Sequence, residues 1–224
     1  MPGILMIDTR ALANCSSLRY AEYPDILVIG EEAFSGCSNL KSAVFPSSLF
    51  MLSKGSLSKC IRLESVSFAE NRHVSTIPPR AFSECKNLQT LVLPKHLQTI
   101  DWEAFFKCER LTQVNLPEEL KKIDRKGFYQ CGLEALELSE GLEYIGESAF
   151  LKCKNIEYVK IPSSVEYLGK WAFHGCNKLK VLEIHHNPEF VGEWLTNKNC
   201  TIRCPKGSKM AAYARQYEIQ VEEF

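Results

Sequence analysis

Two neighbouring stretches of the chain share one pattern, and this pattern decides the fold. The stretch IPPRAFSECKNLQTLVLP runs from Ile77 to Pro94, and IDWEAFFKCERLTQVNLP runs from Ile100 to Pro117. The second begins 23 residues after the first, and Ile, Ala-Phe, Cys, Leu and Leu-Pro return in register while the residues between them change. A fixed period of this length is typical of proteins built from stacked structural repeats.

The pattern extends over most of the 224 residues. Its cysteine recurs eight times, in steps of 22 to 25 residues. The longest step contains a two-residue insertion near Ala69–Ile77, and the step after Cys131 follows a deletion at Gly132. We expect changes of this size to lie in loops. The repeat cysteines are Cys15, Cys37, Cys60, Cys85, Cys108, Cys131, Cys153 and Cys176.

A large apolar residue precedes each repeat cysteine by three positions. The residue directly before this large apolar residue is small. Stacked repeats would bring the large side chains into one column, while the small neighbours let the backbones approach. Each fully buried ring or leucine then contributes about 1.5–3 kcal/mol. We therefore predict that this column is the core. Its members are Leu12, Phe34, Leu57, Phe82, Phe105, Phe128, Phe150 and Phe173.

After each cysteine comes a segment of the form L-x-x-[V/L]-x-[L/I/F], often closed by proline. The alternation of apolar and variable residues predicts a short strand with one buried face. Proline cannot donate to a sheet ladder, so it ends the strand and turns the chain away. One strand per repeat predicts a continuous parallel sheet of eight strands, roughly 38 Å long at a strand spacing of about 4.8 Å.

This pattern resembles the BspA-like class of leucine-rich repeats, whose motif is L-x-x-I-x-x-x-A-F-x-x-C-x-x-L-x-x-V-x-L-P. The match spans about residues 4–184, with local departures at Ala11-Leu12 and Ser56-Leu57. The resemblance implies a leucine-rich repeat solenoid. This is a curved right-handed coil with a parallel β-sheet on the concave face, and loops or short extended segments on the convex face. We expect eight repeats in residues 1–184. Because the chain starts part-way through a repeat, we also expect it to be a fragment of a longer protein.

Residues 185–224 leave the pattern and are predicted to cap the open end of the stack, which would otherwise expose the core. The segment from Thr201 to Gln220 indicates a last strand, a Pro-Lys-Gly turn and a short helix with Ser208 as its N-cap. Four residues of this helix fall on one face and would cover the end of the stack. They are Met210, Tyr213, Ala214 and Tyr217.

The overall charge argues against a polyanionic partner. Lys+Arg and Asp+Glu both number 27, so the formal net charge is zero. A nucleic-acid-binding protein normally shows a basic surface, and we therefore predict no nucleic-acid partner. The sequence also has no basic and apolar leader typical of a signal peptide, and no apolar run long enough to span a membrane. We predict no membrane insertion of this chain.

The sequence gives no pattern typical of an enzyme, a cofactor site or a metal site. It has no glycine-rich phosphate loop, no G-x-S-x-G and no H-E-x-x-H. We predict that the repeat cysteines form a ladder of reduced thiols, because buried free cysteine behaves as a small apolar residue. Cys200 and Cys204, near His185 and His186, leave a zinc site or a disulfide open. An ordinary packed cap is the favoured interpretation, and no catalytic, cofactor-binding or metal-binding residue is predicted.

A fixed interior with a variable surface is typical of a scaffold for macromolecular recognition. The third and fifth positions of each strand motif point away from the core, and at the C-terminal end they combine aromatic, apolar and charged residues that could form a contact surface. We predict a non-enzymatic module whose concave face binds a protein. By resemblance, this module is part of a cell-surface or secreted bacterial adhesin that contacts a host or neighbouring-cell protein. A structural spacer and a carbohydrate-binding module remain alternatives. The predicted contact residues are Tyr158, Lys160, Val181, Glu183, Glu137 and His185.

Overall fold

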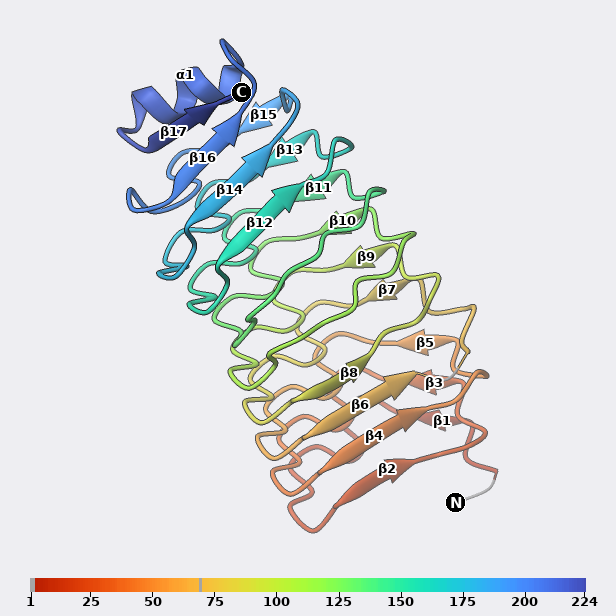
Figure 1. The fold of residues 1–224 in the computed structure, drawn as a ribbon. Helices are drawn as coiled ribbons and strands as arrows, with labels where there is room; N and C mark the ends of the chain where they lie inside the picture. Colours follow the sequence, from red (N-terminus) through yellow and green to blue (C-terminus); the bar gives the residue numbers. More distant parts are fainter. Residues whose placement is uncertain (1–2, 69) are drawn as a thin grey trace.

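The computed structural model describes residues 3–68 and 70–224. The chain winds into an elongated solenoid, and the strands of successive coils lie side by side (Figure 1). All strand pairs in the described part of the chain are parallel. The predicted parallel solenoid is therefore confirmed. Met1, Pro2 and Ala69, which belong to the predicted repeat region, lie outside the described residues.

The strands form two series on two sides of the coil. We call the side of the longer strands the sheet face; it is the face that the sequence predicts to be concave. The sheet face carries β2 (Tyr20–Glu22), β4 (Ser42–Phe45), β6 (Ser65–Phe68), β8 (Thr90–Val92), β12 (Tyr158–Ile161), β14 (Val181–Ile184), β16 (Thr201–Cys204) and β17 (Gln220–Glu223). The other side carries β1 (Met6–Ile7), β3 (Val28–Ile29), β5 (Met51–Leu52), β7 (Thr76–Ile77), β9 (Thr99–Ile100), β10 (Lys122–Ile123), β11 (Tyr144–Ile145), β13 (Tyr167–Leu168) and β15 (Phe190–Val191).

The turn that contains Ala-Phe supplies a third ladder between coils. In the turn of Phe105, the backbone N–H groups of Glu103, Phe105 and Lys107 donate to carbonyls of the next coil at 3.0, 2.8 and 2.8 Å. Glu103 and Lys107 have φ angles of +55° and +58°, a conformation that costs non-glycine residues energy. The three hydrogen bonds per turn offset this cost, since buried backbone groups need partners.

The apolar column is the core of the solenoid, as predicted. Seven of its eight members, from Phe34 onward, are completely buried, and Leu12 in the first coil is partly buried. The phenylalanine rings of successive coils stack with their planes nearly parallel. The ring centroids of Phe82 and Phe105 lie 5.4 Å apart, and those of Phe105 and Phe128 lie 5.1 Å apart.

Each repeat cysteine after the first donates its thiol proton to a backbone carbonyl of the preceding coil. The Sγ atom of Cys108 lies 3.2 Å from the carbonyl oxygen of Phe82, and that of Cys131 lies 3.1 Å from that of Phe105. The cysteine is thus small enough for the column and still satisfies a carbonyl next to the stacked rings. All ten cysteines are free, and Cys15 is the one that is incompletely buried.

We expect the buried thiols to be unreactive in the folded protein. Burial raises the pKa of Cys85 and Cys176 from 9.0 to about 12, so the reactive thiolate is scarce near neutral pH. A thiol reagent at pH 8 should titrate Cys15 rapidly and the other nine only after denaturation. Cys15→Ser should remove the rapid phase. Rapid labelling of several thiols in the folded Cys15→Ser protein would contradict the buried ladder.

The same shifts predict that stability falls at alkaline pH. In the folded protein the pKa values of these thiols lie above the unfolded value of 9.0. The contribution of the buried, protonated thiols to the free energy of unfolding is therefore complete below about pH 9, and it is lost as the pH rises toward 12.

The prediction of one continuous eight-stranded sheet is wrong. The sheet face consists of two four-stranded sheets, β2-β4-β6-β8 and β12-β14-β16-β17, and the fifth and sixth repeats between them form no strand on this face (Figure 1). Elsewhere the first residue after each motif leucine donates to the preceding coil, as Gln89 does to Glu64 at 2.9 Å. Among the described residues, Thr112 and Glu157 lack this bond, whereas Glu134 keeps it with Thr112 at 3.0 Å. The backbone ladder of the sheet face is therefore interrupted twice, between the fourth and fifth repeats and between the sixth and seventh repeats. We call these interruptions the first and second openings of the sheet.

The outward residues of these repeats explain the opening. Gln113, Asn115, Ala135 and Glu137 are neither β-branched nor aromatic, the two kinds of residue that favour strands. Of the six strands that the other repeats place on this face, five carry at least one such residue at these positions, and β6, with Ser65 and Ser67, is the exception. At the second opening, the repeat would place Glu134 beside Glu157, and like charges directly opposite each other weaken a sheet. The turn ladder and the short-strand ladder continue past both openings and hold the coils together.

The C-terminal residues close the stack as the sequence predicts. Ser208 is the N-cap of α1 (Lys209–Gln216), and its side chain accepts a hydrogen bond from the Ala211 backbone N–H. Met210, Tyr213 and Ala214 are buried against the last coil, and Tyr217 is partly buried. The Tyr213 hydroxyl also donates to the Gly192 carbonyl at 2.9 Å. The final strand, β17, was not predicted, and it extends the second sheet beyond β16.

Candidate functional site

Four of the six predicted contact residues lie on two paired strands of the sheet face. Tyr158 of β12 lies beside Val181 of β14, and Lys160 lies beside Glu183. Tyr158 is 46% exposed, and it is the one aromatic residue in the four strands of the second sheet. His185 follows β14 directly, and its ring nitrogen Nε2 lies 2.6 Å from the Glu183 carboxylate. The structure therefore brings these five residues together.

The row of charged residues continues onto the two C-terminal strands. Glu183 lies beside Arg203 of β16, and Arg203 lies beside Glu222 of β17. The Arg203 guanidinium reaches Glu183 at 3.3 Å and Glu222 at 2.9 Å. From Lys160 to Glu222, positive and negative side chains alternate on four adjacent strands. We call Tyr158, Lys160, Val181, Glu183, Arg203 and Glu222 the sheet patch.

The hydrogen bonds of the sheet patch fix the charge state of its central carboxylate. The hydrogen bond with His185 lowers the pKa of Glu183 below its ordinary value, and hydrogen bonds from Arg203 and Tyr158 act in the same direction. Desolvation, followed by the negative charge of Glu183, raises the pKa of Tyr158. Near neutral pH, Glu183 is thus ionised and Tyr158 is neutral. The patch presents fixed charges and one aromatic ring.

Glu137 lies apart from the other predicted residues, across the second opening of the sheet. It belongs to the sixth repeat, which has no strand on the sheet face, and it faces Tyr158 and Lys160 across a groove of about 500 Å³. We call this the β12 groove. Its position depends on the missing ladder, which the sequence pattern did not predict. The residues that line it are Glu134, Ala135, Leu136, Glu137, Leu138, Glu140, Glu157, Tyr158, Lys160 and Pro162.

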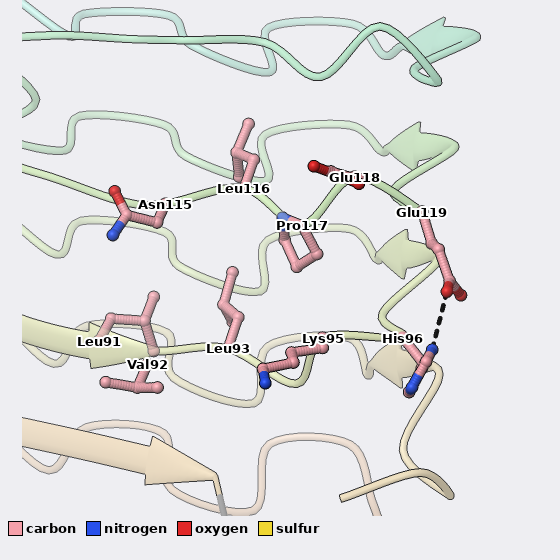
Figure 2. Close-up of a pocket in the computed structure, with 10 residues that line it drawn as sticks. All are labelled: Leu91, Val92, Leu93, Lys95, His96, Asn115, Leu116, Pro117, Glu118 and Glu119. Carbon is pink, nitrogen blue, oxygen red and sulfur yellow. Dashed lines mark hydrogen bonds and ion pairs between the residues drawn. The ribbon is translucent and has the colours of Figure 1, made fainter. Parts of the chain in front are cut away.

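A second groove, the β8 groove, follows the first opening of the sheet. It has a volume of about 480 Å³ and lies between residues 91–96 and 115–119. Figure 2 shows Leu93 on one segment and Leu116 and Pro117 on the other, with His96 and Glu119 joined at one end. The His96 Nδ1 atom lies 2.7 Å from a carboxylate oxygen of Glu119. Sequence reasoning did not find this groove.

Other features that the sequence singled out do not form a site. Cys200 and Cys204 are buried and free in the cap, and the imidazole of His186 contacts the Val165 carbonyl at 2.7 Å. No group of three metal-ligating side chains comes together in residues 3–68 and 70–224. In the same residues, no helix has the length and apolar character needed to cross a membrane.

A family model described as the BspA type leucine rich repeat region, with six copies, matches residues 5–131 and again residues 75–203. The chain belongs to the BspA-type leucine-rich repeat family. Proteins of this family are commonly protein-interaction or surface proteins, and leucine-rich repeat proteins are typically non-enzymatic scaffolds. A search of curated proteins gave no significant match.

Solved structures of other proteins share this fold. The leucine-rich repeat protein of T. pallidum (TpLRR) is 25% identical, with a TM-score of 0.61 over 81% of this chain and 85% of that one. A leucine-rich repeat protein from Bacteroides ovatus is 23% identical, with a TM-score of 0.54 over 98% of this chain. The pneumococcal vaccine antigen PcpA is 14% identical, with a TM-score of 0.53 over 99% of this chain. The chain spans 45% of the Bacteroides protein and 60% of PcpA.

Arg203 and Glu222 are the residues of the sheet patch that sequence reasoning missed. Arg203 stands at an outward position of the predicted last strand, so extending the alternation of inward and outward residues to Thr201–Cys204 would have found it. Glu222 gave no such signal, because Gln220–Glu223 follows a helix and does not match the repeat motif.

Proposed function

We propose that this BspA-type repeat domain is a non-enzymatic module that binds a protein partner through the sheet patch, with His185 and Glu137 at its margin. By family resemblance, the partner is a host or neighbouring-cell protein and the module acts at a cell surface or after secretion. The alternating charged row beside an exposed tyrosine carries this proposal.

The physical properties of the sheet patch support recognition. Its side chains project from paired strands of a continuous four-stranded sheet, so the backbone beneath them loses little freedom on binding. Exposed ion pairs such as Arg203 with Glu222 add little to stability. Alternating charges instead select a partner surface with the opposite order of charges, and the Tyr158 ring can serve as an apolar anchor.

A capture experiment with matched variants tests this proposal. The immobilised domain is exposed to surface proteins of neighbouring or host cells, and each captured protein is then titrated against variants. We expect Tyr158→Ala and Arg203→Ala each to weaken binding by about 1 kcal/mol or more, with nearly unchanged melting temperatures. Tyr20→Ala, which alters a 59% exposed tyrosine of β2, should bind like the unmodified domain.

The outcome also separates the proposal from the alternatives. A spacer domain would capture no protein whose binding responds to changes in the sheet patch. A carbohydrate-binding module would lose its captured glycoproteins after enzymatic deglycosylation, whereas contacts with a polypeptide surface would persist. Equal losses for Tyr158→Ala and Tyr20→Ala would show that recognition is not centred on the sheet patch.

A further inference from the structure

The β12 groove runs along an unused strand edge. β12 pairs with β14 on one side, and no backbone hydrogen bond in the described chain joins it to residues 133–138 on the other. The N–H and C=O groups on that side therefore have no strand partner. Such an edge is where extended peptides add to protein sheets through main-chain hydrogen bonds. β8 has the same free edge beside the β8 groove, so this feature alone does not distinguish the two grooves.

The lining of the β12 groove is apolar at its base. Leu136 and Pro162 are buried, Leu138 is half-buried, and the exposed Tyr158 ring stands at the rim. A volume of about 500 Å³ is within the range of pockets that hold small ligands or a few side chains. The base of the groove can thus cover the aliphatic part of a long side chain.

Charge distinguishes the two grooves. Four carboxylates and one ammonium group line the β12 groove. Of the carboxylates, Glu157 pairs with Lys180 at 3.2 Å, whereas Glu134, Glu137 and Glu140 form no ion pair with any described residue. All three are exposed. The β8 groove holds two carboxylates and two basic side chains, and its His96 and Glu119 already pair.

We propose that the β12 groove binds an extended peptide segment that carries lysine or arginine side chains. The aliphatic stems of these side chains pack on Leu136 and Leu138, and their cations meet Glu134 and Glu137. The main chain of the segment forms hydrogen bonds with the free edge of β12. The inference rests on the proposed function, since it identifies the kind of partner segment that reaches the groove beside Tyr158.

Short synthetic peptides test this inference directly. The probe is a fluorescent hexapeptide of alternating valine and lysine, and its binding to the whole domain is followed by fluorescence anisotropy at low ionic strength. We expect saturable binding of this peptide and none of the corresponding valine–glutamate peptide. Methylation of the backbone nitrogens should weaken binding at least about fivefold if the main chain pairs with the edge. Equal binding of the methylated peptide would overturn docking on the strand edge.

Matched variants locate the bound peptide. The double variant Glu134→Gln, Glu137→Gln should weaken binding of the lysine peptide about tenfold, because two charge contacts are lost. The double variant Glu22→Gln, Glu64→Gln removes two exposed carboxylates of the first sheet and its loop, so it makes the same change in net charge. It should bind like the unmodified domain. Equal weakening in both pairs, or no saturable binding of the lysine peptide, would overturn the inference.

Failure of this inference can be told apart from failure of the proposed function. If the lysine peptide does not bind but a captured protein still depends on Tyr158 and Arg203, only the assignment of a basic segment is wrong. If the peptide binds and no captured protein depends on Arg203, the groove is a peptide site and the sheet patch is not the recognition surface.

Discussion

Replacing Phe105 with alanine should lower the free energy of unfolding by about 3–5 kcal/mol. The side chain is completely buried in the middle of the column, and its ring stacks on Phe82 and Phe128. The substitution leaves a cavity and removes two ring contacts, each worth about 0.5–1.5 kcal/mol beyond burial. Because each coil touches only its neighbours, a defect at this position also weakens the coupling between the two halves of the stack.

The measurement is chemical denaturation followed by circular dichroism, with Phe50→Ala as the matched control. Phe50 is 66% exposed and contacts the His73 ring at a centroid distance of 6.0 Å, so its loss should cost under about 1 kcal/mol. A broader or two-step transition for Phe105→Ala would fit a stack that has lost its coupling. Similar unfolding free energies for the two variants would contradict the role of the column.

Burial in the core and capping of the C-terminal helix could be predicted, because each follows from the type of residue at a single position. A phenylalanine or cysteine that returns every 23 residues or so is buried by stacking, whatever stands on the surface. Phe105 and Cys108 illustrate this, since both are completely buried. Ser208 likewise caps the helix by a hydrogen bond three residues ahead. Such local rules can be read from one sequence.

The continuity of the sheet could not be predicted in the same way, because pairing depends on two repeats together. Every repeat has an alternating segment, yet the alternating segments of the fifth and sixth repeats form no strand on the sheet face. The repeat would place Glu134 beside Glu157 and Gln113 beside Thr90, and only the joint preference of such neighbours decides whether a ladder forms. The two grooves lie where these ladders are missing, which is why the repeat pattern predicted contact residues but no groove.

The candidate site was predicted in part for the same reason. Tyr158, Lys160, Val181 and Glu183 follow from the register of two regular repeats. Arg203 and Glu222 come from segments after the repeat pattern ends, and their place beside Glu183 depends on how the cap folds back onto the sheet. Local alternation indicates which side chains point outward, but it does not show which strands become neighbours.

The segment with the two-residue insertion contains a buried polar residue, Asn71. Its side chain makes hydrogen bonds where the ladder between the short strands is interrupted. The short-strand series is interrupted between β5 and β7, where the insertion lies. Asn71 is only 2% exposed, and its Nδ2 atom lies 2.7 Å from the Leu49 carbonyl oxygen and 3.1 Å from that of Pro46. Its Oδ1 atom accepts from the backbone N–H groups of His73 and Val74, both at 2.8 Å. One side chain thus satisfies backbone groups of two coils.

Asn71→Ala should therefore destabilise the domain by about 3–5 kcal/mol, near the upper end for a single substitution. It removes several hydrogen bonds at once, and each buried backbone group left without a partner costs about 1–3 kcal/mol unless water reaches it. Asn87→Ala is the matched control, because the amide of Asn87 makes one hydrogen bond, at 2.8 Å to the Ile61 carbonyl, and lies near the surface. Its expected cost is about 1 kcal/mol or less. Hydrogen exchange provides a second readout, since the amides of His73 and Val74 should lose protection in Asn71→Ala and keep it in Asn87→Ala. If protection at His73 and Val74 is unchanged in Asn71→Ala, the side chain does not hold the insertion against the preceding coil.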